Sequence, residues 1–257
     1  MNASAAVRVV ERELQLFRKL WRGYAFSTFL SPVLYLAAIG VGLGDLVNEN
    51  TGSINGFDYL DFVTPGLLVA SAVQLAAPES LWPVMAGMKW MGQFHGMVAT
   101  PITPPEVFIG FVLWTTLRTT LGAIVFLIVA AMLGGVPSAW GVLALLPVAL
   151  TAAGFSALFA AYSATQQDDQ SFPLIMRLGL MPLFLFSGTF FPVEQLPDAI
   201  EPLVYLSPLW HGVELARDAT TGDFDALAGL GHVAFLVAFL AAGAAWGMRT
   251  FSRRLAS

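Results

Sequence analysis

The sequence predicts an all-α, polytopic membrane protein with six membrane-spanning helices. Hydrophobic residues make up 57% of the 257 residues and charged residues only 11%, whereas soluble domains carry about a quarter charged residues. Six apolar stretches are each long enough for a helix that crosses a bilayer, which takes roughly 20 residues. Basic residues gather near the two ends of the chain and acidic residues in two other segments. Most of the surface is therefore expected to face lipid.

The six expected spans are separated by short polar or proline-rich segments. They cover approximately residues 24–44, 62–85, 107–133, 140–165, 172–191 and 228–248. Each span is expected to be helical, because an isolated strand in lipid would leave its backbone polar groups unsatisfied. Only five polar residues follow the fourth span, so a tight turn is expected there. Gly40 with Gly44 and Gly243 with Gly247 have a spacing that permits close helix contacts, although chance explains such spacings equally well in this chain.

Residues 1–22 are predicted to form an amphipathic helix outside the six-helix domain of residues 23–257. Its apolar residues recur at steps of three and four: Val7, Val10, Leu14, Phe17 and Trp21. That periodicity is typical of one helical stripe, and basic residues fill the rest of the surface. Such a helix suits the headgroup region of a membrane. The alternative is a helix packed on a partner.

The distribution of charge predicts the orientation in the membrane. Five basic residues precede the first span, three arginines follow the last, and Lys89 lies between the second and third spans. The other loops are acidic, with Arg217 as their one basic residue. The positive-inside rule then places both termini on the cytoplasmic side of the membrane, which is expected to be a bacterial cytoplasmic membrane. The net charge of −5 argues against a nucleic-acid partner, and the absence of cysteine excludes disulfides and thiolate metal sites.

Two short helices are expected on the outer leaflet between about residues 192 and 222. Four prolines in this segment exclude one continuous helix. Ser207 is a candidate N-cap, with Pro208 at the first helical position and Gly222 just past the end. The segment's residues Leu209, Trp210 and Val213 are among those too apolar for a free external loop.

The loop of about residues 86–104 is cytoplasmic in this topology, yet it is rich in methionine and aromatic residues. The candidate docking residues are Met88, Lys89, Trp90, Met91 and Phe94. Such side chains on a water-facing helix indicate an adaptable surface for another protein. The alternative is a helix packed on the protein's own underside. Thr103, Pro104 and Glu106 predict a capping box at the start of the third span.

The sequence contains no motif for catalysis, cofactor binding or metal binding. No phosphate-binding loop is present, and His95, His211 and His232 are too far apart in sequence for a metal pattern, so a structural role is favoured for each. Two charges fall at depth in the predicted spans, Glu79 in the second and Arg118 in the third. They could form a gate or substrate contact, or a structural ion pair that fixes helix register.

Several segments together resemble the permease subunit of type-2 ABC exporters. The local agreement includes residues 65–67 at the start of the second span, residues 99–104 before the third, and residues 187–197 and 208–217 before the last. With Glu79, Trp114 and Arg118, the chain is similar to the subgroup that includes nodulation lipo-oligosaccharide exporters and bacterial multidrug exporters. The resemblance covers nearly the whole chain.

The resemblance implies a transport subunit without enzymatic activity of its own. Two such subunits, identical or different, would pair as a dimer, and each would sit on a separate ATPase that binds ATP and Mg²⁺. The helix at about residues 86–98 would couple the two proteins. The external helices, with Leu209, Trp210 and Val213, would close the exit. An amphipathic drug, lipid or lipid-linked glycan would move outward. The alternatives are a secondary transporter, which would usually show repeated halves, and a membrane-embedded transferase, which would need clustered polar residues.

Overall fold

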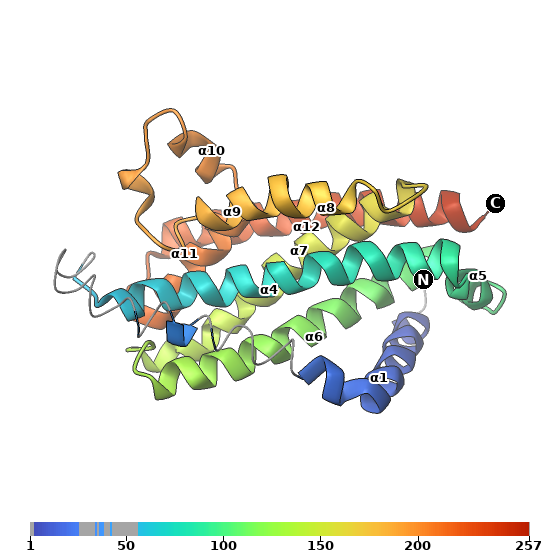
Figure 1. Cartoon of the computed structure of the whole chain (residues 1–257), viewed down its shortest axis with the longest axis horizontal. Helices are drawn as coiled ribbons and strands as arrows, with labels where there is room; N and C mark the ends of the chain where they lie inside the picture. The colour runs from blue at the N-terminus through green and yellow to red at the C-terminus, as the bar shows by residue number, and fades with distance from the viewer. Residues whose placement is uncertain (1–2, 26–33, 35, 39–41, 43–55, 257) are drawn as a thin grey trace.

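The computed structural model describes residues 3–25, 34, 36–38, 42 and 56–256. Four long helices run side by side along the long axis of the molecule (Figure 1): α4 Tyr59–Met85, α6 Pro104–Met132, α7 Leu145–Thr165 and α12 Ala226–Leu255. A 3₁₀ turn, Ala139–Ala144, leads into α7. Among the described residues, four helical segments are long and apolar enough to cross a membrane. These correspond to the second, third, fourth and sixth predicted spans; the first lies largely outside the described residues, with Gly40 and Gly44.

The fifth predicted span is shorter than expected. It consists of α8 Phe172–Leu174, a π-helical turn Ile175–Leu180 and α9 Met181–Leu185. A helix of 14 residues is about 21 Å long, less than the roughly 30 Å of a bilayer core. The prediction that it continues to residue 191 was wrong, because the chain turns at Gly188 with a φ of 73°. The turn is closed by a hydrogen bond of 2.9 Å between the hydroxyls of Ser187 and Thr189.

Small residues allow the long helices to approach each other closely. A Cβ atom on Gly243 would lie 3.2 Å from the Cβ of Ala157 in α7, and one on Gly247 would lie 2.1 Å from the ring of Phe108 in α6. The predicted close contacts of the last span are therefore present. Polar contacts join α4 to α7 as well, since Ser80 and Ser156 form a hydrogen bond of 2.9 Å between hydroxyls. Small side chains and interhelical hydrogen bonds are the contacts that hold helices together in lipid.

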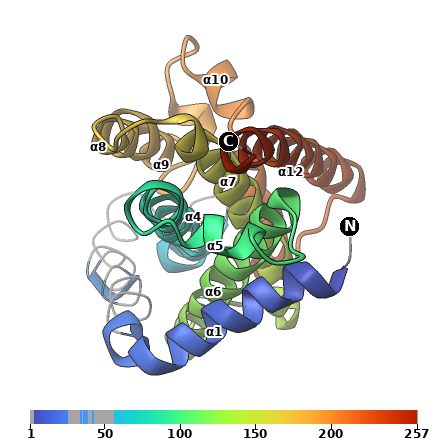
Figure 2. The same ribbon diagram turned by 90° about the vertical axis from the view of Figure 1, so that its right-hand side faces the viewer.

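The N-terminal helix α1, Ala3–Ala25, lies across one end of the bundle and packs on α6 (Figure 2). Its contact face includes a residue outside the predicted stripe, Val9. Val9 is 2% exposed, and a Cβ atom on Gly110 of α6 would lie 2.6 Å from the Cβ of Val9. Val7 and Leu14, by contrast, are exposed. The predicted stripe thus faces partly away from the protein, and its contact with a membrane surface stays a prediction.

The bundle has two different ends. The α5 end carries the short helix α5, Gln93–Val98, the beginning of α1 and the C-terminus (Figures 1 and 2). The α11 end carries α10 Glu201–Tyr205 and α11 Pro208–Thr221, preceded by a 3₁₀ turn Val193–Gln195. Short helices are therefore present where the prolines predicted them. Ser207 accepts a hydrogen bond from the amide of Trp210, and Gly222 ends α11 with a φ of 84°, so both predicted ends are confirmed.

Candidate functional site

The two charges predicted at depth meet. Nη1 of Arg118 in α6 lies 2.5 Å from Oε2 of Glu79 in α4. Pro78 directly precedes Glu79 inside α4, and its missing amide removes one backbone hydrogen bond there. The Arg118 side chain is 5% exposed and that of Glu79 is 29% exposed. The carboxylate is thus the accessible member of the pair, while the guanidinium is enclosed between the helices.

Helix α1 reaches this pair from the side. Glu13 lies on the face of α1 that packs toward the bundle, and its side chain is 18% exposed. Burial raises the pKa of Glu13; the adjacent Arg12 opposes the shift and the charge of Glu79 adds to it. One turn farther along α1, the ring of Phe17 packs edge-on against Trp114, with centroids 5.8 Å apart. The intramembrane pair therefore lies near a junction of α1, α4 and α6.

The predicted coupling helix is interrupted rather than continuous. A π-helical turn, Ala86–Trp90, continues α4, and the chain then passes through Met91 and Gly92 into α5. Gly92 has a φ of 63°, in the left-handed region that glycine adopts without strain. The single helix expected over residues 86–98 is therefore wrong in this detail, because Gly92 lets the chain reverse between two short helical segments.

This break divides the candidate docking residues into two groups. Phe94 is 1% exposed and Met88 is 7% exposed; both belong to a core cluster with Phe111 and Phe251. Trp90 and Met91 are 53% and 69% exposed. One group packs on the protein's own underside, and the other remains on the surface, where docking of another protein stays a prediction.

Side chains from three elements converge on the turn between α7 and α8, residues 166–170. Lys89 donates a hydrogen bond to the carbonyl of Gln167, and Nε1 of Trp82 donates to Oδ2 of Asp169 at 3.1 Å. Nη2 of Arg254 lies 3.4 Å from the carbonyl oxygen of Gln166. This network links the end of α4 and the C-terminal end of α12 to one short turn.

At the opposite end of the bundle, α11 inserts one face between α4 and α7. Leu209 and Val213 are at most 1% exposed and belong to the main core cluster. Gly212 makes the insertion possible, because a Cβ atom there would lie 2.3 Å from the hydroxyl oxygen of Thr151. Trp210 lies on the other side of α11, with its ring 4.7 Å from that of Tyr205. Of the three predicted exit residues, Leu209 and Val213 therefore face the core of the bundle, and Trp210 faces α10.

Arg217 joins α11 to its neighbours at this end. Nη1 pairs with the carboxylate of Glu214, Nη2 donates to the carbonyl of Gly188 at 2.6 Å, and the guanidinium carbon lies 4.3 Å from the ring centre of Phe62. One arginine side chain thus holds together α11, the turn that ends the short fifth helix, and the beginning of α4.

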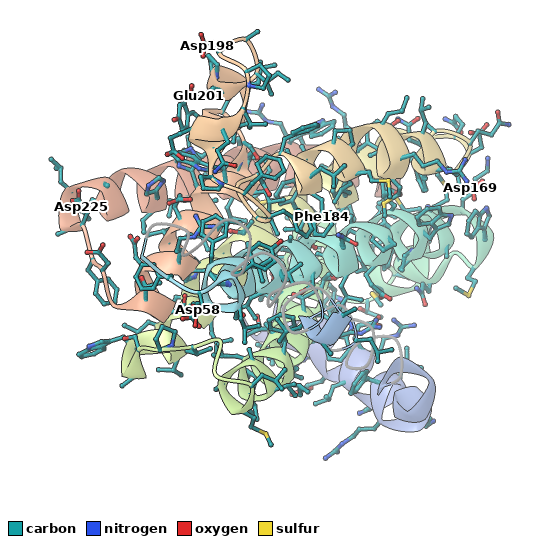
Figure 3. The ribbon with its side chains drawn as sticks, turned by 60° about the vertical axis from the view of Figure 1, so that its left-hand side comes forward. Asp58, Asp169, Phe184, Asp198, Glu201 and Asp225 are labelled. Atoms are coloured by element: carbon teal, nitrogen blue, oxygen red, sulfur yellow. The ribbon has the colours of Figure 1, made fainter. Side chains whose placement is uncertain are left out.

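Several acidic residues gather at the α11 end, where burial and neighbouring carboxylates raise the pKa of one of their number, Asp218. Figure 3 shows Asp198, Glu201 and Asp225 at this end and Asp169 at the other. Burial, together with Glu214, Asp223 and Asp225, raises the pKa of Asp218 to about 6, although Arg217 opposes the shift. The hydrogen bond that the Tyr205 hydroxyl donates to Glu201 raises the pKa of Tyr205 to about 12.

One contact at this end was not predicted from the sequence. His211 and His232 were treated as separate residues, yet their Nδ1 atoms lie 2.7 Å apart. The signal was available in the predicted turn at Gly222, because two helices joined by a short turn can bring residues on either side of it together. Among the described residues no group of three potential ligands could hold a metal ion.

Comparison with known proteins agrees with the resemblance found in the sequence. Residues 5–221 match the family described as ABC-2 type transporter. Nodulation protein J of Rhizobium leguminosarum bv. viciae is 29% identical over 207 residues, which cover 79% of this chain and 78% of that protein. Nodulation protein J of Sinorhizobium fredii is 32% identical over 205 residues, covering 77% and 76%. The inner membrane transport permease YadH of Escherichia coli is 27% identical over 236 residues, covering 89% and 88%. The chain therefore belongs to the ABC-2 type transporter family.

Proposed function

We propose that this protein is the membrane-spanning permease subunit of an ATP-driven exporter. It moves an amphipathic substrate, such as a drug, a lipid or a lipid-linked glycan, outward across the cytoplasmic membrane. A separate ATPase binds ATP and Mg²⁺ and supplies the energy, and a second permease subunit, identical or different, completes the pathway as a dimer. Family membership supports this proposal over a secondary transporter or a transferase.

The observation that carries the proposal is the pair of exposed apolar side chains at the α5 end. Trp90 and Met91 are exposed at the end of the bundle where basic residues of α1 and α12 gather. The positive-inside rule then assigns this end to the cytoplasm. Buried aromatic side chains contribute most to protein interfaces, so Trp90 is the side chain expected to enter a groove of the ATPase.

The chain also offers a matched control for this assignment. Trp140 is 61% exposed, and it lies near the start of α7, at the other end of the bundle. Trp90→Ala is expected to reduce copurification of the ATPase about thirtyfold, the change that follows from roughly 2 kcal/mol at an interface. Trp140→Ala is expected to leave copurification unchanged. Equal effects of the two substitutions would contradict a specific docking role for Trp90.

Orientation has its own test, because the natural chain contains no cysteine. Single substitutions Lys89→Cys and Asp168→Cys are expected to be protected from an impermeant thiol reagent in intact cells. Asp58→Cys and Asp198→Cys are expected to react. Labelling at position 89 would place the α5 end outside and refute the assignment of Trp90 to an intracellular partner.

The pair of Glu79 and Arg118 has two roles in this proposal. It fixes α4 against α6 in the resting state, and the partly exposed Glu79 is the member that a polar group of the substrate can reach. Exchanging the charges, with Glu79→Arg and Arg118→Glu, is expected to restore the stability that either single change removes. Transport is expected to remain impaired, because the accessible charge has changed sign. Full recovery of transport would leave the pair with a purely structural role.

A further inference from the structure

We infer that His211 and His232 are positioning residues for the external helix α11, and that they form one neutral hydrogen-bonded relay from the backbone of α10 to α12. The inference deepens the proposed exporter function, in which α11 lies at the exit. The relay itself follows from the positions of the ring nitrogens and from the chemistry of imidazole.

The surroundings of His211 determine which of its ring nitrogens carries a proton. Its Nε2 atom lies 3.0 Å from the carbonyl oxygen of Tyr205, the last residue of α10. A carbonyl oxygen only accepts hydrogen bonds, so Nε2 of His211 carries a proton. Burial, and to a lesser degree His232, lowers the pKa of His211 to about 4. His211 is therefore neutral at pH 7, and its Nδ1 atom has a free lone pair.

His232 carries its proton on the opposite ring nitrogen, Nδ1. Its Nδ1 atom lies 2.7 Å from Nδ1 of His211. Because Nδ1 of His211 accepts, Nδ1 of His232 must donate and carry the proton. The two imidazoles therefore hold opposite tautomers, and the direction of hydrogen bonding is from His232 to His211 to Tyr205. This order joins α12, α11 and α10.

Aromatic rings enclose the relay and fix its orientation. The ring of His211 stacks on Phe235 of α12, with centroids 3.9 Å apart and planes inclined by 24°. Trp210 packs edge-on against both imidazoles, at 4.9 and 5.0 Å between centroids. With both rings held this way, the imidazoles cannot turn freely to choose other partners. The face of α11 opposite Leu209 and Val213 is thus tied to α12.

Protonation of the imidazoles limits the pH range over which the relay can exist. If both imidazoles were protonated, two N–H donors would face each other across 2.7 Å and the contact would have to open. The charged group that acts on His232 is Glu214 of α11. Its carboxylate pairs with Arg217 and also acts on Tyr205. Helix α12 has no acidic or basic side chain besides His232 before Arg249. The relay is expected to persist down to about pH 5. Its direction should be lost as the pH falls through about 4, because a proton on Nδ1 of His211 leaves this atom unable to accept a hydrogen bond.

Nitrogen NMR of the full chain in detergent micelles tests the relay without any transport measurement. The chain has three histidines, and the exposed His95 can be removed by His95→Gln. With ¹⁵N-labelled histidine at pH 7, one imidazole is expected to be protonated at Nε2 and the other at Nδ1. Two imidazoles with the same tautomer, or two that exchange tautomers freely, would overturn the relay.

A crosslinking measurement tests whether the relay positions α11. Leu215 in α11 faces Gly229 in α12, since a Cβ atom on Gly229 would lie 3.8 Å from Cδ2 of Leu215. In a chain with Leu215→Cys and Gly229→Cys, His232→Phe keeps an aromatic ring but removes the donor, and it is expected to slow disulfide formation about fivefold. His232→Asn, whose amide nitrogen replaces Nδ1–H, should restore most of the rate. An unchanged rate in His232→Phe would refute the positioning role. Both tests are independent of an ATPase partner, so failure of the exporter proposal would leave their outcomes interpretable.

Discussion

The two ends of the bundle are held together by different kinds of contact. At the α5 end, Lys89 and Arg254 donate to backbone carbonyl groups of one turn, and Phe94 fills an aromatic cluster. At the α11 end, carboxylates crowd around Arg217, and the pKa of Asp218 is raised to about 6. The α5 end is thus held by side-chain contacts to one turn and by aromatic packing, whereas the α11 end contains a carboxyl group, Asp218, whose pKa is raised by burial and by neighbouring carboxylates. In the proposed function, the α5 end would meet the ATPase and the α11 end would form the exit.

The largest effect is expected from Phe94→Ala at the α5 end. The ring of Phe94 lies 6.2 Å from that of Phe111 and 5.9 Å from that of Phe251, measured between centroids. Truncating a buried phenylalanine costs about 3–5 kcal/mol of folding free energy. Thermal unfolding in micelles should show a clearly lower midpoint. Trp90→Ala, close by but exposed, should leave the midpoint nearly unchanged. A similar loss in both variants would contradict the division of this loop into buried and exposed residues.

The next largest effect is expected from Arg217→Gln at the α11 end. The substitution removes the pairing with Glu214, the hydrogen bond to Gly188 and the contact with Phe62. Hydrogen bonds to charged groups contribute about 1.5–3 kcal/mol each in buried sites, and the cation–π contact adds to them. We expect a loss of about 2–3 kcal/mol in the free energy of unfolding. Arg253→Gln, at an exposed position of α12, is the matched control and should cost less than about 0.5 kcal/mol.

A smaller effect with a clear pH dependence is expected from Asp218→Asn. Because the folded state raises the pKa of Asp218 to about 6 from 3.8, the charged carboxylate destabilises the fold above pH 6. Stability from this group is regained as the pH falls from about 6 to 4. Asp218→Asn should therefore stabilise the protein by about 1 kcal/mol at pH 7.5 and by much less at pH 4.5. Thermal unfolding of the variant and the parent at pH 7.5 and at pH 4.5 measures this stabilisation as the difference between their midpoints.

The control for this experiment is Asp198→Asn, because Asp198 is exposed at the same end. It should change the midpoint little at either pH. A stabilisation by Asp218→Asn that is equally large at pH 4.5 would show that the charge of Asp218 is not responsible.

Local chemistry made parts of this structure predictable from the sequence. The capping box of Thr103 and Glu106 is present, with 2.8 Å between the Thr103 amide and Oε2 of Glu106. The ends of α11 at Pro208 and Gly222 also follow from single residues whose backbone preferences are strong. The meeting of Glu79 and Arg118 was predictable because an isolated charge at depth is too costly.

Other features depend on contacts that a sequence pattern does not contain. The π-helical turn that ends at Trp90 has five residues and α5, which contains Phe94, has six. Both are too short for a periodicity that would show Phe94 buried and Trp90 exposed. The early end of α9 depends on how residues 187–189 pack against Gly66, where a Cβ atom would lie 2.7 Å from the Cα of Thr189. The contact of His211 with His232 requires the relative rotation of two helices, which hydrophobicity alone does not determine.

The smallest effect on stability is expected from Lys89→Gln, which tests whether the α5 end acts as one body. Lys89 and Arg254 approach the same turn from different helices, so either can hold the turn when the other is lost. Each contact is at least partly exposed, and such contacts contribute about 0.5 kcal/mol or less. In detergent micelles, Lys89→Gln and Arg254→Gln should each raise the rate at which a thiol reagent labels Asp168→Cys less than twofold. The double variant should raise it by more than the product of the two single effects, because the turn then loses both contacts. Effects that simply multiply would show that Lys89 and Arg254 hold the turn independently, and residues 86–98 and α12 would then not share it as a common anchor.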